Sequence, residues 1–145
     1  PSHQRWMNNG KFDGGQLTDS EKSLRDFYKR LLNFSTRSSA LMGDFQEIQT
    51  LNRQSTLGFD PGIYAFTRWS DTQKLIVVTN FSWLTTSNFE LKIPEDVITK
   101  WNLKDGEYTI TDQLYNKSVI QLEVSNGEGR VQVEIGPSES FIYQL

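Results

Sequence analysis

Hydrophobic and polar residues repeat with two different periods along the chain, and the period changes near residue 38. In residues 18–34 the apolar positions recur every three or four residues, which predicts an amphipathic helix. Its stripe consists of Leu24, Phe27, Leu31 and Phe34, with Tyr28 and Leu32 beside them. Thr18 and Glu21 have the spacing of a capping box at the helix start. We expect the face of Leu24, Phe27 and Leu31 to belong, at least in part, to an interface outside this chain.

After residue 38 the apolar residues alternate with polar ones, which predicts strands. The expected strands are 45–51, 63–70, 74–82, 89–93, 108–112, 119–124, 131–135 and 141–145. The second and third of these form a hairpin, and residues 74–82 are apolar on both faces, which predicts a central strand. Strands 119–124 and 131–135 are joined across Asn126-Gly127 by a loop that we expect to exceed two residues.

Two segments interrupt this pattern. Residues 1–17 carry turn formers without an apolar period and are predicted to be loop. Residues 95–101 are expected to make one or two helical turns. About eight short strands with turn signals between them predict a mainly β fold, an antiparallel Greek-key β-sandwich preceded by one amphipathic α-helix.

Composition agrees with one domain that depends on aromatic rings for its core. The chain has 145 residues, with 4 Trp, 5 Tyr and 9 Phe, while hydrophobic residues make up only 36%. The rings must therefore fill much of the interior. Because the chain starts at Pro1 and not at Met, we expect it to be part of a longer polypeptide.

Charge and residue usage exclude several classes of function. A net charge of −3 argues against nucleic acid or an anionic membrane as partner. The longest apolar run, 75–78, is far too short for a membrane span. With 0 Cys, disulfide frameworks and thiolate chemistry are excluded. The single histidine, His3, lies near the terminus, where neither a catalytic triad nor a multi-histidine metal site is expected.

The candidate acidic residues are best explained as structural. Asp105 with Glu107, or Glu134 with Glu139, could form a carboxylate pair for glycoside hydrolysis, but solvated turn and strand-edge positions are the favoured explanation. Three further aspartates could bind calcium, although none has EF-hand spacing and each fits a turn: Asp60, Asp71 and Asp112. No catalytic, cofactor-binding or metal-binding residue is therefore assigned.

Tryptophans provide the candidate sugar contacts. Trp69, Trp83 and Trp101 could stack on pyranose rings, but packing in the core or at its rim is favoured for most of them. Trp83 is the main exception, because it follows a predicted strand end among polar residues.

Several motifs together resemble the end of an α-amylase of glycoside hydrolase family 13. They are Arg5-Trp6-Met7, the helix Leu24-Arg25-Asp26-Phe27-Tyr28-Lys29-Arg30-Leu31-Leu32, Ser39-Ala40-Leu41 with Gly43-Asp44-Phe45, and the hairpin 63–68 with 75–82. The final segment 137–145 resembles the last strand of that family's C-terminal domain.

The resemblance implies residues 1–37 as the tail of a catalytic (β/α)₈ barrel and residues 38–145 as the C-terminal β-sandwich. The family's three catalytic carboxylates would lie upstream of Pro1, so the chain itself is expected to lack catalysis, and calcium is expected only in the catalytic part. The implied partner is the barrel, with an α-glucan as a second candidate partner. Trp83 and Trp6 are the candidate sugar contacts. The resemblance also implies a bacterial protein outside the cytoplasm.

Three functions are therefore weighed. The first is a non-catalytic C-terminal domain that supports the barrel of an α-amylase-like enzyme. The second is an autonomous carbohydrate-binding module, and the third is a protein-interaction domain without sugar affinity. The capped helix favours the first, because a free binding module has no need of an unpartnered amphipathic helix.

Overall fold

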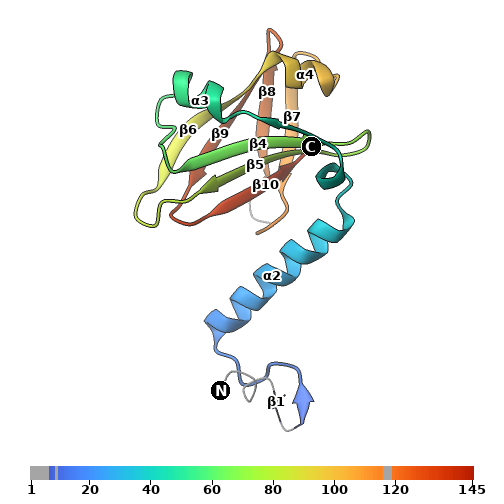
Figure 1. Ribbon diagram of the computed structural model, residues 1–145, viewed down its shortest axis with the longest axis vertical. Helices are drawn as coiled ribbons and strands as arrows, with labels where there is room; N and C mark the ends of the chain where they lie inside the picture. The colour runs from blue at the N-terminus through green and yellow to red at the C-terminus, as the bar shows by residue number, and fades with distance from the viewer. Residues whose placement is uncertain (1–6, 9, 116–118) are drawn as a thin grey trace. The chain divides into compact units, whose positions relative to one another are not determined.

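The computed structural model describes residues 7–8, 10–115 and 119–145. It divides into two compact units, Pro1–Thr36 and Arg37–Leu145, which are described separately. Figure 1 shows the second unit as a curled sheet with short helices beside it. No helix within the described ranges is long and apolar enough to cross a membrane.

The first unit contains a short strand pair and most of the long helix. β1 (Met7–Asn8) and β2 (Lys11–Phe12) pair antiparallel, so the prediction of loop throughout 1–17 was wrong at these residues. The backbone reverses there with help from Gly10, whose φ of 82° suits a residue without Cβ.

The predicted helix is confirmed as α2 (Asp19–Arg37), which runs three residues beyond the predicted end at Phe34. Thr18 and Glu21 form the predicted capping box: the Thr18 backbone N–H donates to Glu21 Oε2 over 2.8 Å, and the Glu21 N–H donates to Thr18 Oγ1 over 3.3 Å. No residue of α2 is buried, and three large residues of its apolar side are more than half exposed: Leu24, Tyr28 and Leu32.

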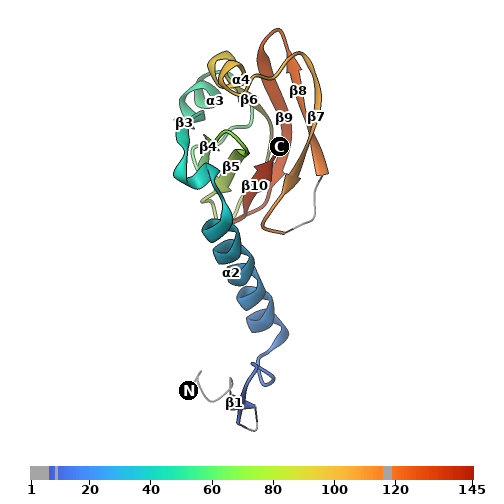
Figure 2. The ribbon, with the colours of Figure 1, turned by 90° about the vertical axis from the view of Figure 1, so that its right-hand side faces the viewer.

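The second unit is one eight-stranded antiparallel sheet in the order β3-β4-β5-β10-β7-β8-β9-β6. The strands are β3 (Asp44–Glu47), β4 (Ile63–Trp69), β5 (Lys74–Asn80), β6 (Ser87–Ile93), β7 (Gly106–Asp112), β8 (Val119–Ser125), β9 (Glu128–Ile135) and β10 (Ser140–Gln144). Figure 2 shows that the sheet curls until β4, β5 and β10 face β7, β8 and β9 across the core. This confirms the predicted mainly β fold of about eight antiparallel strands; the Greek-key assignment stays a prediction.

The core lies between these two halves and is filled by alternate residues of each strand. In β4 and β5 most inward residues are aliphatic, for example Ile63, Ile76 and Val78. Phe141 and Tyr143 stack at 5.3 Å on the inner side of β10. β5 pairs with β4 on one side and β10 on the other, so its prediction as a central strand is confirmed.

Short helices lie beside the two edge strands, β3 and β6. The predicted strand 45–51 was wrong in its second half, because β3 ends at Glu47 and α3 (Gln49–Ser55) begins two residues later. Ile48 and Asn52 are both buried and lie four residues apart, a helical spacing that the apparent alternation concealed. α4 (Glu95–Lys100) follows β6, as predicted, and the short helix η1 (Ala40–Met42) precedes β3.

The connection between β8 and β9 is shorter than predicted. Ser125 pairs with Glu128, so the turn has only Asn126 and Gly127 between the strands. Their φ values of 53° and 77° are those of a type I′ turn, which suits the twist of a two-residue hairpin. The turn is held by Asp105, whose carboxylate accepts hydrogen bonds from both backbone N–H groups at 3.1 and 3.3 Å.

Candidate functional site

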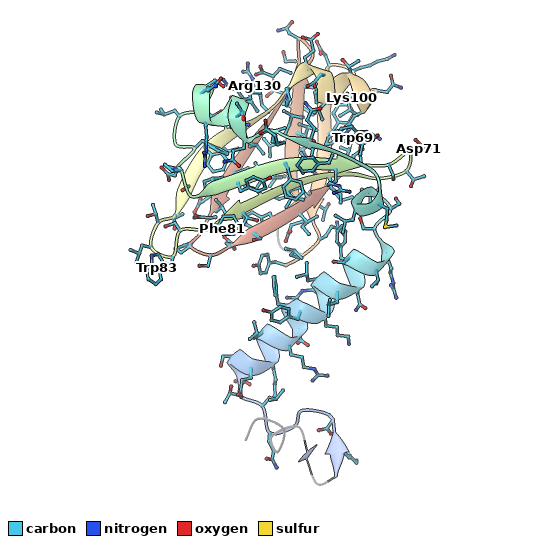
Figure 3. All side chains as sticks on the ribbon, viewed as in Figure 1. Trp69, Asp71, Phe81, Trp83, Lys100 and Arg130 are labelled. Carbon is cyan, nitrogen blue, oxygen red and sulfur yellow. The ribbon has the colours of Figure 1, made fainter. Side chains whose placement is uncertain are left out.

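The loop after β5 displays three large apolar side chains. Phe81, Trp83 and Leu84 are 72%, 81% and 83% exposed. Figure 3 shows Phe81 and Trp83 at the opposite end of the sheet from Trp69, Asp71 and Lys100. The sequence singled out Trp83 as the tryptophan least needed inside, and the structure places it on the surface.

This loop is held by a network of buried and backbone hydrogen bonds. Asn80 is 1% exposed, and its Nδ2 donates to the carbonyls of Thr85 and Gly136 at 2.8 and 3.0 Å. Its Oδ1 accepts from the Ser82 N–H over 2.9 Å, and the Ser82 hydroxyl accepts from the Thr85 N–H over 3.1 Å. Trp83 is therefore presented by an ordered loop, which lowers the entropy cost of binding through its ring.

The other tryptophans differ in position. Trp6 lies outside the described residues. Trp101 is 3% exposed and belongs to the core, and Trp69 packs against it edge to face with ring centroids 6.3 Å apart.

Trp69 and Trp101 line a hollow of about 1040 Å³ that sequence reasoning missed. Three parts of the chain meet there: the η1–β3 junction, the β4–β5 turn and the end of α4. Its charged lining residues are Asp44, Asp71, Lys74 and Lys100. The Lys100 ammonium lies 5.7 Å from the centroid of the Trp69 ring. The sequence offered two weak signals, a tryptophan at the end of β4 and another directly after α4.

The acidic candidates take part in turns or lie on strands. Glu139 Oε2 accepts from the Gly136 N–H over 2.8 Å, and Glu107 lies opposite Glu123 across β7 and β8. Glu134 and Glu139 line the same second hollow, of about 580 Å³.

The three candidate calcium aspartates do not share a hydrogen-bond partner among the described residues. Asp112 is buried and accepts from the backbone N–H groups of Leu114, Tyr115 and Ile142. Asp60 accepts from the Ser87 hydroxyl at 2.5 Å, and Asp71 lines the first hollow. Within the described ranges no three acidic or histidine side chains gather as metal ligands.

The two outer faces of the sheet differ in chemistry. One, called here the apolar outer face, consists of the exposed or half-buried rings Phe45, Tyr64 and Phe66 on β3 and β4, with the buried side chains of Val77 and Ile142 beside them on β5 and β10. Phe66 lies 5.5 Å from Phe45 and 5.7 Å from Tyr64 between ring centroids, and it pairs across strands with Val77. Phe45 and Tyr64 are 51% and 37% exposed.

The opposite side, called here the charged outer face, is formed by β6, β7, β8 and β9. Its outward residues include Asn88, Glu90, Lys92, Glu107, Glu123, Arg130, Gln132 and Glu134. Arg130 Nε lies 3.9 Å from Glu90 Oε1 on this face. The two outer faces thus differ in polarity, one with charged and amide side chains and the other with partly exposed aromatic rings.

Comparison with known proteins identifies the fold. No family model and no curated protein match the sequence. Among solved structures, an AmyP variant in complex with maltotriose matches 92% of the chain with a TM-score of 0.59 and 17% identity. AmyP in complex with maltose matches 88% at 0.56 and 17% identity. An Anoxybacillus α-amylase matches 92% at 0.55 and 15% identity.

The likeness confirms the resemblance seen in the sequence at the level of fold. The chain spans 23%, 21% and 25% of the lengths of these three structures. Its fold is therefore that of a segment of larger α-amylase structures.

Proposed function

We propose that this chain is the non-catalytic C-terminal part of an α-amylase-like glycoside hydrolase that acts on α-glucans. Its main role is to support the catalytic barrel. The observation that carries this proposal is the fold likeness to segments of α-amylase structures over 88% to 92% of the chain. In this proposal residues 1–37 complete the barrel and residues 38–145 form the supporting domain.

The apolar outer face supports a packed partner. Phe45, Tyr64 and Phe66 form a continuous row of rings that are only partly covered in this chain, so a partner would bury the apolar surface that remains exposed. A partner that covers this row of rings would therefore stabilise both this domain and itself. The apolar stripe of α2 offers a second surface for the same partner, because none of its residues is buried in this chain.

An α-glucan substrate is supported by the ligands of two structural neighbours. The AmyP structures hold maltotriose and maltose. The proposal extends this class of substrate to the enzyme to which this chain would belong.

The test compares the two outer faces in the full-length polypeptide. Phe45→Ser and Tyr64→Ser remove rings from the apolar outer face, whereas Val119→Ser removes an apolar side chain that is 66% exposed on the opposite side. We expect the first two to speed thermal inactivation about fivefold or more, since about 1 kcal/mol changes a folded population by that factor. The KM for maltoheptaose should not change, and Val119→Ser should behave as wild type.

Two results would overturn the proposal. One is a full-length polypeptide without α-glucan hydrolysis. The other is equal inactivation rates for the variants of the two faces.

A second candidate function is an autonomous carbohydrate-binding module, which the exposed Trp83 ring on its ordered loop favours. Calorimetry with maltoheptaose separates the two. Micromolar or tighter affinity in the wild-type chain, lost in Trp83→Ala while the fold survives, would favour the binding module.

A further inference from the structure

The turn between β8 and β9 carries the two groups needed for a covalent rearrangement. Asn126 is exposed, and the residue after it, Gly127, has no side chain to shield the backbone. In such an Asn-Gly pair the backbone nitrogen of the glycine can attack the side-chain amide carbon of the asparagine. Electrophile and nucleophile are therefore neighbours in this turn.

The reaction consumes only water. The Gly127 nitrogen loses its proton and forms a bond to Asn126 Cγ, while the bond from Cγ to Nδ2 breaks and Nδ2 leaves with that proton as ammonia. Water then opens the cyclic imide. Attack at Cγ gives aspartate at position 126, and attack at the backbone carbonyl gives isoaspartate, in which the main chain runs through an additional methylene group.

Asp105 opposes the first step of this reaction in the folded chain. Its Oδ2 accepts from the Asn126 N–H over 3.1 Å, and its Oδ1 accepts from the Gly127 N–H over 3.3 Å. The second bond keeps the proton on the attacking nitrogen and directs that N–H toward Asp105. The closed turn also holds φ at 53° and 77°, so the nitrogen must leave this geometry to reach Cγ.

The surroundings of the turn show what the reaction would change. Figures 1 and 2 show the β8–β9 turn at the same end of the sheet as α4. The Glu95 side chain of α4 lies beside it, because a Cβ built on Gly127 would come within 3.3 Å of Glu95 Cγ. A new carboxylate at position 126 would stand near those of Asp105 and Glu95, and isoaspartate would also lengthen the two-residue turn. Both changes would weaken the β8–β9 hairpin.

We propose that Asn126 is a site of spontaneous deamidation and isomerisation that Asp105 suppresses in the folded chain. The site stays intact while the two hydrogen bonds to Asp105 hold the turn, and it reacts when the turn opens. The same carboxylate thus stabilises the hairpin and protects its chemistry. This inference rests on the turn alone and is independent of the proposed function.

The experiment incubates the 145-residue chain in mildly alkaline buffer and follows deamidation by peptide mass spectrometry. Asp105→Ala removes both acceptors, whereas Glu107→Ala removes an exposed carboxylate of β7 and leaves the turn bonds in place. We expect Asn126 to deamidate about threefold or more faster in Asp105→Ala, the factor by which loss of a net hydrogen bond shifts the opening of the turn. Glu107→Ala should behave as wild type.

A second Asn-Gly pair, Asn9-Gly10, gives an internal reference in every sample, because its rate should be the same in all three chains. Asn9 itself lies outside the described residues. In concentrated guanidinium chloride the three chains should also deamidate Asn126 at one rate, faster than the folded wild type, since Asp105 reaches the turn only in the fold.

Thermal melting checks that each variant is folded. If Asp105→Ala does not fold, Asp105→Ser replaces it, because serine keeps one shorter acceptor and should give an intermediate rate. The proposal is overturned if Asn126 deamidates as fast in the folded wild type as in denaturant. It is also overturned if the folded Asp105 variant deamidates Asn126 at the wild-type rate.

Discussion

At the scale of single residues, two buried asparagines hold parts of the second unit that regular strand pairing does not reach. Asn80 holds the loop that displays Trp83. Asn52 joins α3 to the edge strand β6: its Nδ2 donates to the Lys92 carbonyl over 2.9 Å, and its Oδ1 accepts from the Lys92 N–H over 2.8 Å. An amide can serve both a donor and an acceptor of one residue, which no apolar side chain can do.

Replacement of Asn52 by leucine should therefore cost far more than its change in volume suggests. Asn52→Leu leaves the partly buried N–H and carbonyl of Lys92 without their Asn52 partner and also removes the bond to the Ile48 carbonyl at 2.8 Å. We expect a loss of about 2–4 kcal/mol in the free energy of unfolding. Denaturant unfolding measures it, with Gln54→Leu on the exposed side of α3 as the matched control. Equal stability of the two variants would contradict the bridging role.

At the scale of elements, α2 presents an amphipathic helix whose apolar side is uncovered. Leu24 is more than half exposed, and Phe27 and Leu31 are only partly buried. Such a stripe in water favours association with another apolar surface. The prediction that this face belongs to an interface outside the chain rests on this exposure.

The isolated chain should therefore self-associate through α2. Leu24→Ser with Leu31→Ser should lower the association measured by sedimentation over a range of protein concentrations. The control Lys22→Ser with Lys29→Ser, on the opposite side of the same helix, also replaces two good helix formers by serine and should leave association unchanged. A wild-type chain that sediments as a monomer at every concentration would contradict this prediction.

Elements whose sequence pattern lies within a short stretch of the chain were predictable. Elements that depend on contacts between residues far apart in the sequence were not. The capping box of α2 and the hairpin of β4 and β5 involve residues close in sequence. The first residues of α3, up to Leu51, were predicted as strand. The contact that buries Asn52 comes from β6, about 40 residues further along the chain, so the local sequence does not indicate it. The Trp69 hollow needs three separate segments, so no single stretch of sequence indicates it.

At the scale of the whole molecule, the two outer faces of the sheet carry different kinds of side chain. The apolar outer face carries partly exposed aromatic rings, and the charged outer face carries charged and amide side chains. The carboxylates that the sequence offered as candidate acid/base pairs lie on different turns and strands. Asp105 holds the β8–β9 turn, and Glu139 accepts a hydrogen bond from the Gly136 N–H. Glu134 is an exposed residue of β9.

This arrangement predicts that the chain by itself hydrolyses no α-glucan. Glycoside hydrolysis requires one carboxyl group to donate a proton while a second acts as nucleophile or base, so both must flank the same bond. Glu139 is engaged by a backbone N–H at 2.8 Å, and Asp105 is engaged by two. Incubation with starch or maltoheptaose, followed by a reducing-sugar assay, should give the value of buffer alone, while an α-amylase added to the same substrate should give a strong signal. Turnover that Glu134→Gln or Glu139→Gln abolishes would show that the second hollow, which both residues line, is an active site after all.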